Sequence, residues 1–152
     1  MIKLILAALA VPAIASAQTG LLVVGHGAGP AWNARVRATV AQVRWDGPVA
    51  TAFLMGPEAG SAGWEAAVAE LVNSGARSVV VVPLMISSCG DHYRQVLFYA
   101  GALSEMPAEL TGHTHGRPAS HPPIPFRVTG ALDDAAELGD ALAEVWDSLP
   151  AG

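Results

Sequence analysis

After residue 20, the chain alternates short apolar segments with longer segments of helical periodicity. Short apolar runs are typical of buried strands, and apolar residues spaced three or four apart are typical of helices. Strands that alternate with helices through short connections form right-handed βαβ units with a parallel sheet. The sequence therefore predicts one α/β domain, a single-domain three-layer sandwich with a four-stranded, mostly parallel sheet. The expected strands are 21–25, 49–55, 78–85 and 126–130, and the expected helices are 30–44, 61–75, 90–106 and 133–149.

The segment 78–85 (SVVVVPLM) has a run of four valines, so we expect it to be the most strongly buried strand. The segment 107–125 is rich in proline, glycine and histidine, which is typical of a long loop. The tryptophans are expected to anchor the core or an interface rather than to stack on a ligand; they are Trp32, Trp45, Trp64 and Trp146.

The first 17 residues have the pattern of a signal peptide. Lys3 gives a positive start, an apolar stretch follows, and Ala15 and Ala17 form an A-x-A cleavage motif. The stretch is short for a bilayer span, although an uncleaved membrane anchor is the alternative. We therefore expect a signal peptide at 1–17, a domain at 18–152, and a periplasmic or secreted protein that is not stably inserted in a membrane.

The charge of the chain excludes some partners. Without Lys3, seven arginines stand against thirteen acidic residues, and no basic cluster occurs. Such a chain is not expected to bind nucleic acid or an anionic membrane surface. Cys89 is the single cysteine and cannot form an internal disulfide, so it is a buried thiol, a metal ligand or a free thiol.

Two histidines follow expected strands directly. His26 comes after the first strand in the sequence LLVVGHGAGP, and His92 comes after the third strand, at the start of a helix. In parallel sheets, ligands bind at the carboxyl ends of the strands. If the two strands are neighbours, both imidazoles reach one cleft, where the adjoining helix N-termini favour the neutral form that a metal ligand or a base requires. The alternative is that each histidine is only a turn or helix-start residue.

Three segments carry a family resemblance: LLVVGHGAGPAWNARV, GWEAAVAELVNSGARSVVVVPLMIS and GDHYRQV. Together they resemble the short sirohydrochlorin chelatases of the class II chelatase group. The resemblance implies that His26 and His92 handle the metal and act as catalytic residues. It also implies a homodimer that inserts Co²⁺ or Fe²⁺, with Ni²⁺ as a further candidate, into sirohydrochlorin or a related tetrapyrrole without a nucleotide cofactor.

The carboxylates of a tetrapyrrole need cationic donors. Arg94, on the helix that bears His92, is the best-placed candidate, and Arg35 is a weaker one. For both arginines the alternative is an exposed helix charge without a ligand.

Further side chains have the chemistry of metal ligands. Cys89 lies three residues before His92, and the loop HTHGRPASH adds His113, His115 and His121. These loop histidines either collect metal beside the main cleft or are solvated residues of an ordinary loop. No G-K-[ST] motif follows the glycines around His26, and no G-x-S-x-G elbow occurs, so nucleotide hydrolysis and serine hydrolase chemistry are not expected.

Two features depart from the resemblance. Tetrapyrrole assembly belongs in the cytoplasm, yet the chain begins with the pattern of an export signal, and ISSCGDHY replaces a less polar connection before the second histidine. A second hypothesis therefore stays open. It is a periplasmic protein that binds or delivers a metal or tetrapyrrole through the same cleft without turnover.

Overall fold

A computed structural model describes residues 18–110, 124–134 and 136–147 of the chain. The predicted signal peptide and the loop histidines His113, His115 and His121 lie outside these residues. The elements, in chain order, are β1 (Gln18–Gly25), α1 (Pro30–Val40), β2 (Val49–Phe53), α2 (Trp64–Asn73), β3 (Ala76–Pro83), α3 (Asp91–Tyr99), the 3-10 helix η1 (Ala108–Leu110), β4 (Phe126–Val128), the 3-10 helix η2 (Leu132–Asp134) and α4 (Ala136–Asp147).

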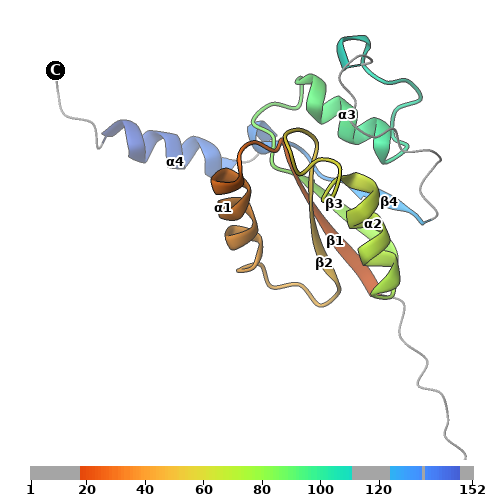
Figure 1. Cartoon of the computed structure of the whole chain (residues 1–152). Coiled ribbons are helices and arrows are strands. Elements are labelled where there is room, and N and C mark those ends of the chain that lie inside the picture. Colours follow the sequence, from red (N-terminus) through yellow and green to blue (C-terminus); the bar gives the residue numbers. More distant parts are fainter. Residues whose placement is uncertain (1–17, 111–123, 135, 148–152) are drawn as a thin grey trace, which may run out of the picture.

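The four described strands form one sheet in the order β2-β1-β3-β4, and every pairing is parallel (Figure 1). The predicted α/β fold is therefore confirmed. Helices α2 and α3 lie on one face of the sheet and α1 lies on the other, which gives three layers. The central strands β1 and β3 are direct neighbours, with Val24 paired to Pro83. This adjacency brings the segments that follow the two strands to the same edge.

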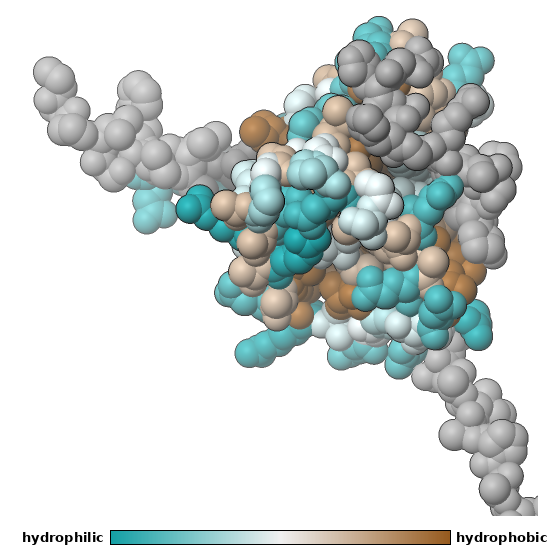
Figure 2. Space-filling view, viewed as in Figure 1, coloured by the Kyte–Doolittle hydropathy of each residue, from teal (hydrophilic) through white to brown (hydrophobic). Residues whose placement is uncertain are grey.

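Helix α4 projects away from the sheet, and the element that it mainly contacts is η2 (Figure 1). Hydrophobic surface is exposed close to the point where α4 leaves the domain (Figure 2). Within the part of the chain that the structure describes, no helix combines the length and the apolar character needed to cross a membrane.

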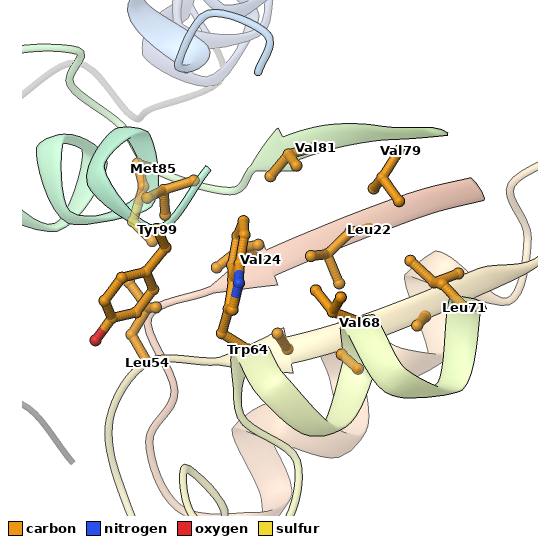
Figure 3. Close-up of a cluster of buried hydrophobic side chains, with 14 of the residues drawn as sticks. Leu22, Val24, Leu54, Trp64, Val68, Leu71, Val79, Val81, Met85 and Tyr99 are labelled. Atoms are coloured by element: carbon orange, nitrogen blue, oxygen red, sulfur yellow. The ribbon is translucent and has the colours of Figure 1, made fainter. Parts of the chain in front are cut away.

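The core lies between the sheet and α2, with α3 closing one end (Figure 3). Leu22 and Val24 from β1 and Val79 and Val81 from β3 point into it. Trp64 also belongs to this core and stacks on Phe126 with their ring centroids 5.4 Å apart. This position agrees with the expected core role of that tryptophan.

The other tryptophans differ from Trp64. Trp32 and Trp45 are partly exposed, and the Trp45 indole donates a hydrogen bond to the Thr19 carbonyl. They are therefore not core residues. The side chain of Trp146 lies outside the description.

The expectation that 78–85 is the most strongly buried strand is wrong. In β3, Val79 and Val81 are buried, but Val80 and Val82 between them are only half-buried. In β1, by contrast, every residue from Gly20 to Gly25 is buried. The reason is the helix arrangement: α1 packs against β1, whereas α4 leaves the same face of β3 partly uncovered.

Helix α3 is shorter than predicted. It ends at Tyr99 rather than near residue 106, because Gly101 adopts a φ of 77°. A glycine in this left-handed region ends a helix, since residues with a side chain rarely adopt it.

Candidate functional site

His26 stands at the carboxyl end of β1, on a loop that has room only for glycine at the next position. Gly27 has a φ of 88°, and a Cβ atom there would lie 2.2 Å from the carbonyl oxygen of Met55. The Met55 amide donates to the His26 carbonyl at 2.7 Å, so the two loops pack backbone to backbone. This contact fixes the main chain of His26 while its side chain stays exposed.

His92 lies in the first turn of α3, directly after Asp91, and is partly buried. Its Nε2 atom is 3.1 Å from the Nε2 atom of His26. The ring centroids are 4.5 Å apart, and the planes are inclined at 78°. The predicted convergence of the two imidazoles, 66 positions apart in the chain, is therefore confirmed.

The other ring nitrogen of each histidine is committed to an oxygen acceptor. His26 Nδ1 is 2.8 Å from the Gly27 carbonyl oxygen, and His92 Nδ1 is 3.0 Å from Gln95 Oε1. Carbonyl and amide oxygens accept hydrogen bonds but cannot donate them, so both Nδ1 atoms carry the proton. In the neutral rings, both Nε2 atoms then present lone pairs to each other.

A buried amide stands behind His92. Gln95 is 2% exposed, and its Nε2 atom donates to the Tyr99 hydroxyl at 2.9 Å. Burial raises the pKa of Tyr99 above its usual value, which keeps this hydroxyl protonated. Because Gln95 has its amide nitrogen directed at Tyr99, its oxygen is directed at His92. The helix α3 thus sets both the orientation and the tautomer of His92.

A second buried amide stands beside the His26 loop. Asn33 is 0% exposed; its Oδ1 atom accepts from the Ala28 amide at 3.0 Å, and its Nδ2 atom donates to Glu58 at 2.7 Å. Glu58 is also paired with Arg37, and the hydrogen bond from Arg37, followed by that from Asn33, lowers the pKa of this carboxyl. The network ties α1, the His26 loop and the loop after β2 together.

These two amides are the buried polar side chains among the described residues, and each supports one of the histidines. Sequence reasoning missed both. The signal for Gln95 was its place three residues after His92, which puts both on one side of a helix. The signal for Asn33 was a polar residue at the apolar spacing of Val36 and Val40.

Other predicted site residues are not brought together with the pair. Arg94 and Arg35 are exposed on α3 and α1, and Arg94, two residues after His92, leaves the helix on nearly the opposite side. Cys89 is exposed rather than buried. Within the described ranges no group of three or more His, Cys, Asp or Glu side chains could hold a metal, so Cys89 does not complete a three-ligand set.

The chain matches the family model of the CbiX family over residues 20–149. This range contains β1 from Gly20 onward, the other three described strands, the histidine pair and both buried amides. No curated protein sequence matched the chain.

Proposed function

Since the chain belongs to the CbiX family of short class II chelatases, we propose that it inserts Co²⁺ or Fe²⁺, with Ni²⁺ as a further candidate, into sirohydrochlorin or a related tetrapyrrole. Membership of the family supports the general activity, which is chelatase-type metal insertion by a lyase. His26 and His92 are the residues that we assign to the metal. The metal ion is a substrate of this reaction and not a resident cofactor.

The observation that carries the proposal is the approach of the two Nε2 atoms to 3.1 Å while both Nδ1 atoms face oxygen acceptors. Two acceptor atoms at this distance repel unless a proton or a cation lies between them. With metal–nitrogen bonds of about 2.1 Å, this separation corresponds to an angle at the metal of roughly 95–100°, between octahedral and tetrahedral values. Imidazole nitrogen also suits Co²⁺ and Fe²⁺ better than Mg²⁺ or Ca²⁺.

The chemistry of insertion requires two events. The metal ion must shed water, and two pyrrole nitrogens must lose their protons. One imidazole of the pair can hold the ion while the other receives a proton, since both present an unprotonated Nε2 atom. The exposure of His26 leaves the pair open to a large flat ligand. Arg94 and Arg35 do not lie beside the pair, so we propose them only for carboxylates at the far rim of that ligand.

A second candidate function follows from the N-terminal sequence. If residues 1–17 direct export, a periplasmic protein that captures or delivers a metal or tetrapyrrole would use the same histidine pair without turnover. We propose export together with either function. Mass spectrometry of the protein from a periplasmic fraction should find a chain that begins at Gln18, and an intact N-terminus there would contradict cleavage.

An insertion assay separates the two functions. The purified chain, Co²⁺ and sirohydrochlorin should give a rate above the spontaneous one, followed by the absorbance of the macrocycle. His26→Ala and His92→Ala should each lower this rate by about 100-fold or more, the scale of a lost acid–base group. Tyr93→Phe is the matched control on the same turn of α3, because it removes a hydrogen bond to Thr129 and leaves both imidazoles in place.

The outcomes are distinct. Metal binding at one equivalent without any rate enhancement would support delivery and reject catalysis. Full activity in both alanine variants would reject the histidine pair as the site. The family resemblance also leads us to propose a homodimer, which sedimentation of the purified chain measures directly.

A further inference from the structure

One tryptophan lies partly exposed beside the residue that leads into His26. Trp32 belongs to the first turn of α1 and is 40% exposed. Its Cη2 atom lies in the space beside Gly25, where a Cβ atom would be only 3.3 Å from it. Because Gly25 directly precedes His26 in the chain, this large aromatic side chain borders the candidate site.

The position of Trp32 is fixed from two sides. Helix α1 is tied to the His26 loop by the bond between Asn33 and the Ala28 amide. Phe53, which is 0% exposed, lies against the indole with the ring centroids 6.2 Å apart and the planes inclined at 63°. Among the described aromatic rings, none is therefore stacked on the indole. A side chain that is held in place in this way loses little freedom when it binds a ligand.

A second exposed tryptophan shows how Trp32 differs from an ordinary surface residue. Trp45 is 38% exposed, but its indole N–H donates to the Thr19 carbonyl at 2.8 Å, near the amino end of β1. The indole N–H of Trp32 has no hydrogen-bond partner among the residues that the structure describes. Trp32 therefore presents both an apolar ring and an open donor at the carboxyl end of the sheet, where the histidine pair lies.

A tetrapyrrole has the chemistry that these two groups can bind. Its conjugated ring system is flat and apolar, and it extends in every direction beyond the four nitrogens that take the metal. With those nitrogens at the histidine pair, part of the ring system lies over the residues that border the pair. Aromatic rings attract one another in offset and inclined arrangements, and an N–H group can donate to a carboxylate at the rim of the macrocycle.

We propose that Trp32 binds the macrocycle: its indole packs against the flat ring system near the rim, and its N–H donates to a carboxylate of that rim. This inference rests on the proposed function, because it takes a tetrapyrrole as the ligand. It gives Trp32 no part in holding the metal ion or in moving protons. Recognition is thus divided between the histidine pair, which takes the metal, and the start of α1, which takes the ring.

Binding of metal-free sirohydrochlorin tests this assignment. The absorbance of the macrocycle is followed as the purified chain is added, without metal. Trp32→Leu keeps apolar bulk against Phe53 but removes the flat ring and the N–H, so binding should weaken about tenfold. Trp32→Phe keeps a flat ring and loses the N–H, so binding should weaken about threefold. Equal losses in the two variants would overturn the role of the ring, and unchanged affinity in both would overturn the proposal.

The matched control is Trp45→Leu. It removes a tryptophan of nearly equal exposure from the other end of β1, far along the strand from the histidine pair. Its affinity for sirohydrochlorin should equal that of the wild type. A loss as large as that of Trp32→Leu would show that the effect does not depend on the position beside the site, and it would overturn the assignment.

The affinity for Co²⁺ alone separates ring binding from damage to the histidine pair. The visible spectrum of the bound ion should give the same affinity for Trp32→Leu as for the wild type, whereas His26→Ala should bind more weakly. A matching loss of Co²⁺ affinity in Trp32→Leu would make Trp32 a support of the His26 loop and would overturn its contact with the macrocycle.

The insertion assay distinguishes failure of this inference from failure of the proposed function. Trp32→Leu should raise KM for sirohydrochlorin and leave kcat unchanged, since it removes binding that is equal in the ground state and the transition state. Insertion with the same KM in the variant and the wild type would reject Trp32 and keep the chelatase. Binding of the macrocycle that depends on Trp32, without any insertion, would reject catalysis and keep Trp32.

Discussion

The two faces of the sheet are closed to different degrees. On the face covered by α2 and α3, Val79 and Val81 are 1% and 0% exposed, whereas Val80 and Val82 on the opposite face are half-buried. Alternate valines of the same strand therefore lie in two different environments. The closed face provides the folding core, and on the open face, where α1 is the described helix that packs, the apolar side chains of β3 stay half-buried. The candidate site takes one supporting amide from each side, Gln95 on α3 and Asn33 on α1.

The largest difference in stability between the two faces should come from the neighbouring residues Val81 and Val82. We expect Val81→Ala to lower the free energy of unfolding by about 2 kcal/mol, since it leaves a cavity in the closed core. Val82→Ala should cost less than about 1 kcal/mol in the monomer, because water already reaches that side chain. Urea denaturation at low protein concentration measures both values. Equal losses would remove the distinction between the two faces.

A smaller effect is expected for Gln95, the buried amide on the closed face that orients His92. Gln95→Leu keeps the volume but removes the acceptor for Nδ1, so the metal-facing nitrogen can become protonated. We expect a roughly tenfold weaker affinity for Co²⁺, the scale of a lost supporting hydrogen bond. The visible spectrum of bound Co²⁺ reports this directly. Gln95→Glu, which keeps an oxygen acceptor, should restore most of the affinity; equal loss in both variants would make the role of Gln95 merely structural.

The buried amide of Asn33, which holds the His26 loop from the open face, is tested by its removal. Asn33→Ala leaves the Ala28 amide and one oxygen of Glu58 without this partner, and we expect a loss of about 1 kcal/mol in stability. Thr39→Ala, on the exposed side of the same helix, is the control and should change the stability by less than about 0.5 kcal/mol. No difference between the two variants would show that the amide does not hold the His26 loop.

The smallest effect is a pH dependence at Glu58. Hydrogen bonds from Arg37 and Asn33 lower its pKa below the usual 4.5, so its contribution to stability is present above that pH and is lost as the pH falls through the lowered value. Between about pH 6 and pH 3, the melting temperature of the wild type should fall more steeply than that of Glu58→Gln. Parallel pH curves would contradict this contribution.

The sequence predicted the class of fold because its strands and helices alternate clearly. It also predicted that His26 and His92 meet, since both follow strands whose ends share one edge. It did not predict the half-open face of β3, because a run of four valines looks the same whether a helix covers one side or both. Gln95 and Asn33 were missed for a related reason: a polar residue in a helix is usually solvated, and only the packing shows that these two are enclosed.

A pair of imidazoles is a small ligand set, and among the described residues no third acidic, thiol or histidine group joins it. A cation bound by two nitrogens keeps most of its coordination positions for other ligands, and its residence time on the protein is correspondingly short. A four-nitrogen macrocycle would compete successfully for such an ion. If the pair holds the metal as we propose, the geometry at the end of β1 and the start of α3 suits passage of the ion through the protein better than its storage there.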